Sequence, residues 1–181
     1  MTRTPNADRA RQVLRQATME SHQRVDDLFS HFSLEKRSSY AAFLKAHARA
    51  LAPLEEIARP DAPRLPMLAQ DLAALGEALP TPLAISMLMP PSDAFRWGAR
   101  YTLEGSRLGG AVLVRRVGPG LPNAYLSATH DKGGWADFQR TLDVAAAGGD
   151  GQWIDEAIRG AQAAFDLFAT AAGDEVTIVH G

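Results

Sequence analysis

The segment YTLEGSRLGG (residues 101–110) places three glycines, Gly105, Gly109 and Gly110, within an otherwise helical pattern. Each glycine inside a helix costs roughly 1 kcal/mol relative to alanine, because its unfolded backbone has more freedom to lose. Three such residues within six positions therefore indicate that another group approaches the backbone of this helix closely.

A second segment, RQATMESHQRVD (residues 15–26), also has helical spacing and carries His22. A histidine that binds a metal as neutral imidazole needs a hydrogen-bond acceptor to fix its ring, and Asp26 lies one turn further on. Arg15 lies two turns earlier on the same face, where it could reach a carboxylate at the edge of a ligand. A histidine on one helix, facing a second helix opened by glycines, could hold a flat ligand with a metal at its centre, such as heme.

These features have ordinary structural alternatives. His22 could be a solvated or packed helix histidine, and the glycines could serve close packing between two helices. Ser106 could bond a water or dioxygen on a bound iron, or it could bond back to a carbonyl of its own helix. The spacing of these residues leaves both interpretations open.

The other four histidines lack a comparable arrangement: His31, His47, His130 and His180. No His-x-x-x-His or Glu-x-x-His pair occurs, so a non-heme metal site is not expected. The glycine segment differs in spacing from phosphate-binding glycine motifs and follows no predicted strand, which argues against a flavin or nicotinamide site.

Composition excludes several other classes of protein. The chain has 181 residues, 46% hydrophobic and 22% charged, which suits one globular domain. Its net charge of −2 gives no reason to expect a nucleic-acid partner, and the absence of cysteine excludes disulfides and thiolate ligands. Residues 1–8 lack the apolar core of a signal peptide and no long apolar run follows, so we expect a cytoplasmic protein without a membrane segment.

Apolar residues at spacings of three and four predict an all-α single domain of six to eight helices. Asp8 is expected to cap the first helix. Residues 1–7 and 173–181 are predicted to be tails, since the strand-like run 176–179 has nothing to pair with. The segment 83–89 is either a short buried helix or an extended piece. The predicted helices span residues 8–29, 34–58, 66–78, 93–117, 135–147 and 152–172.

Together, the run LRQAT with His22 and the run YTLEGSRLGG resemble the heme oxygenase family, specifically its bacterial branch associated with phytochromes. The order of predicted helices is similar over residues 8–172. The resemblance implies a single-domain multi-helical bundle that holds heme between its first, proximal helix and a distal helix kinked by glycines.

The resemblance also implies roles for individual residues. His22 matches the axial iron ligand, with Asp26 at the acidic position behind it. Arg15, and in a looser match Arg140, correspond to bases that pair with heme propionates. The distal residues that match family positions close to the heme are Gly105, Ser106, Gly109 and Gly110. Ser106 stands where animal members carry an aspartate that organises water over the iron, which makes turnover less certain than binding.

The activity implied is oxidative ring opening of heme to biliverdin, with release of CO and Fe²⁺. Heme would be both cofactor and substrate, an external reductase or ferredoxin would supply electrons, and a bacteriophytochrome could receive the biliverdin. Three alternatives remain open: a heme-binding or heme-sensing protein without turnover, a relative of thiamin-degrading enzymes, and an interaction module. The lack of cysteine counts against the second of these, because many such enzymes use a cysteine nucleophile.

Overall fold

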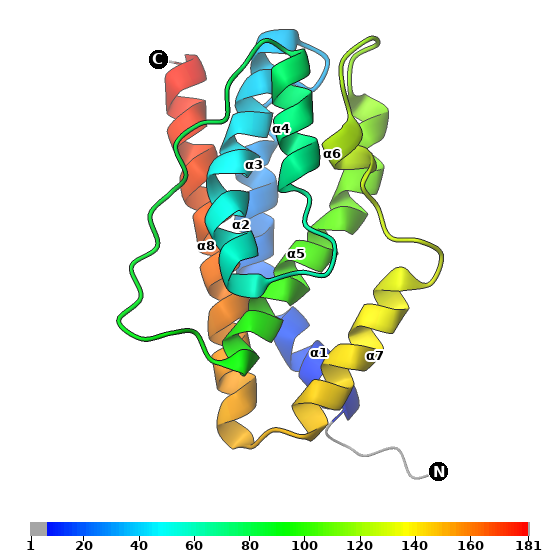
Figure 1. Ribbon diagram of the computed structural model, residues 1–181, viewed down its shortest axis with the longest axis vertical. Helices are drawn as coiled ribbons and strands as arrows, with labels where there is room; N and C mark the ends of the chain where they lie inside the picture. The colour runs from blue at the N-terminus through cyan, green and yellow to red at the C-terminus, as the bar shows by residue number, and fades with distance from the viewer. Residues whose placement is uncertain (1–6, 181) are drawn as a thin grey trace.

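The computed structural model describes residues 7–180, and within this range every regular element is a helix (Figure 1). The long α8 runs along one side of the bundle, and α1 lies beside α7 at the lower right of Figure 1. The predicted all-α class is confirmed. The elements are α1 Ala7–Ala17, α2 Met19–Phe29, α3 Arg37–Ala58, α4 Leu65–Ala74, α5 Asp93–Leu113, the 3₁₀ helix η1 Val114–Arg116, α6 Ala124–Ser127, α7 Gly134–Ala147 and α8 Gly151–His180.

The closest crossing in the bundle joins α5 and α8. A Cβ atom added at Gly98 of α5 would overlap the carbonyl oxygen of Ala157, and one added at Gly160 of α8 would overlap that of Phe95. Glycine at both positions therefore lets the two backbones touch. The sequence analysis did not single out either residue.

Two groups of buried side chains hold the helices together. The larger core joins α3, α4, α5 and α8, and it includes the periodic residues of the predicted second helix: Tyr40, Phe43, Leu44, Leu51 and Leu54. A smaller cluster ties α1 and α7 to α5 and α8 through Leu14, Leu142 and Ala161, with Trp97, Tyr101 and Phe138 packed around them. The predicted apolar face of the second helix is confirmed by this burial.

The predicted first helix is two helices, which corrects the expectation of one continuous element. α1 and α2 meet at Thr18, whose hydroxyl donates a 2.7 Å hydrogen bond to the carbonyl of Leu14. A threonine bonded back to the carbonyl four residues earlier often bends a helix, which accounts for the break. Asp8 lies inside the first turn of α1, so it does not precede the helix as predicted.

The C-terminal tail predicted at 173–181 is wrong for the described residues. α8 continues to His180 and includes the strand-like run 176–179, while Glu175 is buried and Val176 packs against the core. With no strand to pair with, these residues satisfy their backbone hydrogen bonds by extending the helix. The predicted boundary at residue 172 therefore falls inside α8.

Smaller differences concern the connections between helices. α4 ends at Ala74, earlier than the predicted residue 78, and the short α6 was not predicted. Segment 83–89 has no helix, so the extended alternative is confirmed. Leu83 packs against the core, whereas Leu88 is fully exposed.

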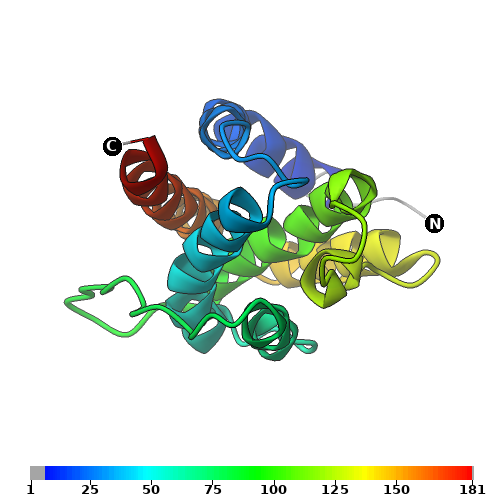
Figure 2. The ribbon, with the colours of Figure 1, turned by 90° about the horizontal axis from the view of Figure 1, so that it is seen from above.

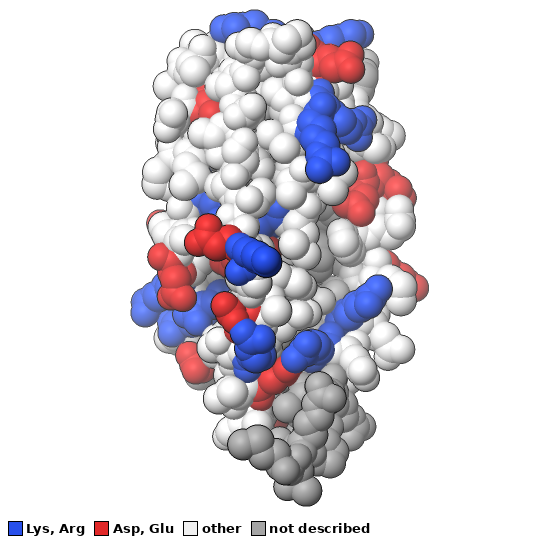
Figure 3. Space-filling model, turned by 90° about the vertical axis from the view of Figure 1, so that its right-hand side faces the viewer, with Lys and Arg blue, Asp and Glu red and all other residues white. Residues whose placement is uncertain are grey.

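The surface is mixed in charge where it can be seen. In Figure 3, which faces the right-hand side of Figure 1, acidic and basic side chains are interspersed. Among the described residues no helix is long and apolar enough to cross a membrane.

Candidate functional site

His22 lies on an exposed face of α2, with 63% of its side chain accessible to solvent. Its ring stacks on Phe165 of α8, with a centroid separation of 5.5 Å and an interplanar angle of 27°. One face of the imidazole is therefore supported by the protein while its edge remains accessible to a ligand.

Asp26 contacts the His22 ring as the sequence predicts, but it lies beside Nε2 and not beside Nδ1, where an acceptor behind a metal-binding Nε2 is expected. The carboxylate lies 3.5 Å from Nε2, which is the nitrogen expected to bind iron. Metal-binding histidines generally use one ring nitrogen for the metal and the other for the acceptor. Iron binding at Nε2 therefore requires the ring to turn, or Asp26 to move away. Both side chains are 63% exposed, so nothing in the core has to move.

The other histidines whose side chains are described occupy different environments. His47 is buried in α3 and its Nδ1 lies 2.7 Å from the Tyr125 hydroxyl. Burial, helped by the charge of Arg64, lowers the pKa of His47 to about 3, so this ring is neutral. His130 pairs with Glu104 at 2.7 Å, and His31 is exposed at the end of α2.

On α5, two of the three glycines have room for a Cβ atom. A Cβ added at Gly109 would meet no described atom within 4 Å, and one at Gly105 would meet Trp135 at an ordinary 3.7 Å. A Cβ at Gly110, in contrast, would lie only 3.0 Å from the carbonyl oxygen of Leu126. Close helix packing thus explains Gly110 but neither Gly105 nor Gly109. α5 remains one helix across all three positions.

The same face of α5 is apolar. Leu108 and Val112 are 44% and 66% exposed, and residues 105, 108, 109 and 112 share one side of a helix. Water therefore covers an apolar helix face whose two glycines leave the backbone accessible.

The exposed faces of α2 and α5 flank the same stretch of α8. Both helices pack against α8. On α8, Ala161 approaches Gly98 of α5, and Phe165, one turn further on, contacts His22 of α2. In Figure 2, viewed along the bundle, α2 lies at the top and α5 crosses the centre. His22 and the Gly98 end of α5 thus border one region beside α8.

Arg15 and Tyr101 mark one end of this region. Burial raises the pKa of the Tyr101 hydroxyl, and the positive charge of Arg15 on α1 opposes that shift, so the two groups are near each other. Tyr101 belongs to the glycine segment, but the sequence analysis did not predict that it binds a ligand. Its place four residues before Gly105, on the same side of the helix, could have indicated such a contact. Arg140 is 67% exposed on α7 and pairs with Asp137 of its own helix.

Ser106 points away from the exposed face of α5. Its hydroxyl donates a 2.7 Å hydrogen bond to the carbonyl of Leu103 and accepts one from the buried guanidinium of Arg64. The structure thus has the carbonyl bond that was one of the two alternatives for this residue. A hydroxyl has one proton to donate, so in this arrangement Ser106 can accept a further hydrogen bond but not donate one.

The neighbours of Ser106 belong to a buried network. Arg107 bonds Glu104 at 3.0 Å and the carbonyl of Ala128 at 3.0 Å, and Glu104 also holds His130. These charged side chains are therefore directed into the protein.

The chain resembles heme oxygenases of known sequence and structure. No protein-family model matches the chain. A heme oxygenase from Xanthomonas campestris pv. campestris (strain 8004) is 39% identical over 120 residues, which cover 59% of this chain and 66% of that protein, slightly less than two thirds of its length. The resemblance to heme oxygenases that the sequence indicates is confirmed.

The fold agrees with that of a solved heme oxygenase. The enzyme from Neisseria meningitidis, whose crystal structures were determined in the NO- and CO-bound forms, superposes with a TM-score of 0.74 over 93% of this chain and 92% of that one. Its sequence is 23% identical, so the likeness is one of fold. The predicted heme oxygenase-like helical bundle is confirmed.

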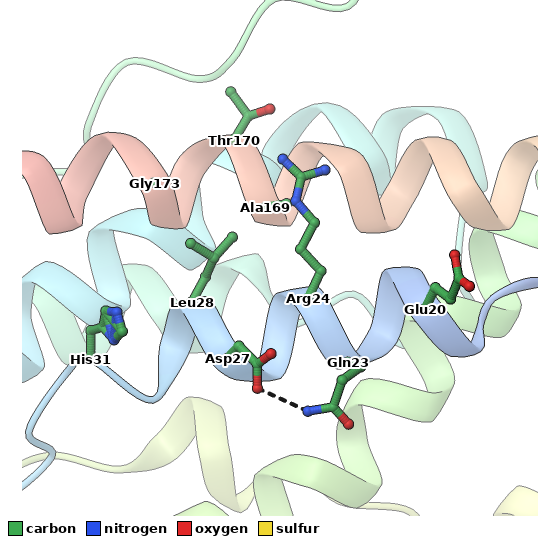
Figure 4. Close-up of a pocket in the computed structure, with 9 residues that line it drawn as sticks. All are labelled: Glu20, Gln23, Arg24, Asp27, Leu28, His31, Ala169, Thr170 and Gly173. Carbon is green, nitrogen blue, oxygen red and sulfur yellow. Dashed lines mark hydrogen bonds between the residues drawn. The ribbon is translucent and has the colours of Figure 1, made fainter.

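A separate groove lies between α2 and α8 (Figure 4). Its walls include Glu20, Arg24 and Asp27 of α2, His31 in the turn after α2, and Thr170 and Gly173 of α8. Residues 20, 24 and 27 share one face of α2, and His22 lies on the other. The groove contains none of the residues predicted to bind heme.

Proposed function

We propose that this protein is a cytoplasmic heme oxygenase that opens the heme ring to biliverdin and releases CO and Fe²⁺. The observation that supports this most strongly is the contrast on α5: Gly105 and Gly109 leave the helix backbone open, and no packing contact requires either glycine. Such a backbone admits the close approach of a flat macrocycle.

Heme would supply the reactive iron and the ring that is oxidised, while the protein would supply binding, orientation and control of water. His22 would bind the iron on the α2 side. Gly105 and Gly109 would let the ligand lie against α5, and Leu108 and Val112 would keep water from its apolar surface.

One edge of the ligand would be held by polar groups. Arg15 would pair with a propionate through charge-assisted hydrogen bonds, and the neighbouring Tyr101 phenol would donate another. Arg140 would be a third partner if its side chain leaves Asp137. These contacts would fix the rotation of the ring in its plane.

Ser106, which points away from the exposed face of α5, could still accept a hydrogen bond from a water. Its own proton is bonded to the carbonyl of Leu103, so the protons required for ring opening would have to come from water. Electrons would come from an external reductase or ferredoxin. The resemblance to the phytochrome-associated branch further favours a bacteriophytochrome as the recipient of biliverdin.

A hemin titration of the purified protein, followed by ascorbate under air, tests this function. We expect a one-to-one histidine-ligated spectrum that decays to the absorption of biliverdin. His22→Ala should lose the histidine-ligated spectrum, whereas His31→Ala, at the far end of α2, should keep it. Absence of hemin binding by the parent protein would contradict the proposal.

A second candidate is a heme-binding or heme-sensing protein without turnover. The hydroxyl proton of Ser106 is already bonded to the carbonyl of Leu103, so Ser106 cannot donate a proton to a bound ligand in this arrangement. This favours heme binding without turnover. A stable hemin complex, with no ring opening after reduction in air, would support this function over the enzyme.

A further inference from the structure

Trp135, near the start of α7, borders the open face of α5. Its Cη2 atom lies 3.7 Å from the position that a Cβ of Gly105 would occupy, and apart from the adjacent residues and nearby backbone of α5 it is the one described atom within 4 Å of that position. The indole edge thus stands where the exposed glycine face ends on the side of α7.

Contacts on several sides fix this indole. The ring of Trp135 stacks on Phe138, with a centroid distance of 5.7 Å and an interplanar angle of 20°, and lies 5.9 Å from both Tyr101 and His130. His130 is itself held by its 2.7 Å contact with Glu104. Side chains packed in this way resist displacement, so the indole forms a rigid boundary.

The turn before α7 places Trp135 at this point. Gly133 has a φ of +81°, a conformation that side chains other than glycine rarely adopt, and it directs the chain into the helix. A Cβ at Gly134 would lie 2.9 Å from the Cβ of His130, so this glycine lets the start of α7 lie against the histidine.

We propose that Trp135 determines which meso carbon of heme is oxidised. The proposal rests on the function proposed above. Propionate contacts from Arg15 and Tyr101 would hold one edge of the ring, but an exposed arginine tolerates small shifts of its partner. The indole edge beside Gly105 is the rigid stop that limits how far the ring slides or turns toward α7.

Trp97 provides a matched control. It belongs to the same aromatic group, 6.0 Å from Phe138, and it also contacts the guanidinium of Arg100 at 5.1 Å. Trp97 and Trp135 therefore share an aromatic partner, but it is Trp135 that contacts the Gly105 position.

The experiment compares Trp135→Phe, Trp135→Ala and Trp97→Phe. Biliverdin isomers are separated by chromatography after turnover, and proton NMR of the heme methyls in the ferric hemin complex reports the in-plane orientation without turnover. We expect the parent and Trp97→Phe to share one isomer pattern and one orientation. Trp135→Ala should give at least one additional isomer and orientation, and Trp135→Phe a smaller change in the same direction. Hemin affinity should fall about three- to tenfold in Trp135→Ala.

Each result decides the proposal. An unchanged isomer pattern and NMR orientation in folded Trp135→Ala would overturn it, and if that variant does not fold, Trp135→Phe decides. If the parent binds hemin without turnover, the NMR orientation decides alone. Failure of the parent to bind hemin would reject the proposed function itself, a result distinct from a failure of the role of Trp135.

Discussion

Two pairs of glycines on α5 have opposite surroundings. At Gly98 and Gly110 an added Cβ would overlap or crowd a backbone carbonyl of another helix, whereas Gly105 and Gly109 face open space or an ordinary contact. The first pair shapes the fold, and the second pair has no packing role in the described structure. The comparison shows that glycines of one helix can be required for different reasons, which only their neighbours distinguish.

The largest expected effect is at the packed pair. Gly98→Ala places a methyl group on the carbonyl of Ala157, so α5 and α8 must separate. We expect the free energy of unfolding to fall by about 3 kcal/mol or more, the upper range for overpacking. Urea denaturation followed by circular dichroism measures this. An unchanged unfolding midpoint would show that the crossing of α5 and α8 adapts without strain.

The fold was predictable from the sequence wherever apolar spacing reports burial. The apolar residues that recur at spacings of three and four within the predicted helix 34–58 are buried, as expected. The break at Thr18 and the helical run 176–179 were missed for a common reason. A side-chain bond to a carbonyl and the absence of a partner strand override local preference, and neither follows from spacing.

The second prediction extends the comparison to two histidines, exposed His22 and buried His47. Burial lowers the pKa of His47 from 6.5 to about 3, so the His47 ring is neutral in the folded protein at neutral pH. The stabilisation from this neutral ring is complete above pH 6.5 and is lost as the pH falls toward 3, because the unfolded chain binds a proton that the folded chain excludes. Each pH unit in that window should lower the free energy of unfolding by up to about 1.4 kcal/mol.

The variant His47→Gln isolates this contribution, because glutamine does not titrate and can still bond the Tyr125 hydroxyl. Urea denaturation of both proteins between pH 7 and pH 4 should give a shallower pH dependence for the variant. Parallel curves would mean that other groups control acid unfolding.

The third prediction concerns Gly109, one of the two glycines of α5 without a packing role. Gly109→Ala should raise the stability of the ligand-free protein by about 0.5–1 kcal/mol, since alanine favours a helix and the space beside it is free. Hemin affinity should nevertheless fall by about tenfold or more, because the added methyl group stands where the ligand approaches, a loss of roughly 1.4 kcal/mol.

Gly173→Ala on α8 is the matched control for this prediction. It too has no described atom within 4 Å of an added Cβ, but it lies at the groove between α2 and α8. It should gain stability without losing hemin affinity. Equal hemin affinities in the parent, Gly109→Ala and Gly173→Ala would remove the ligand-binding explanation for the open glycines.

The site was partly predictable from the sequence. Residue types and spacing indicated His22, Asp26 and the glycines, but not which glycines pack, since Gly110 meets Leu126 of a helix that was not predicted. Nor could spacing reveal that Ser106 bonds Arg64 from the loop before α4. Contacts between segments distant in sequence depend on how the helices assemble, and the spacing of residues in a single sequence does not reveal them.

The smallest expected effect is at Tyr101, which lies near Arg15 at one end of the exposed face of α5. Burial raises the pKa of Tyr101, so at neutral pH its phenol is protonated and can donate to a propionate. Tyr101→Phe should weaken hemin binding about threefold to tenfold, the range for one hydrogen bond to a charged acceptor. Hemin dimethyl ester carries no carboxylates, so it should bind the parent and the variant equally. If Tyr101→Phe weakens both ligands alike, the tyrosine supports the open face by packing, and Arg15 alone holds the propionate edge.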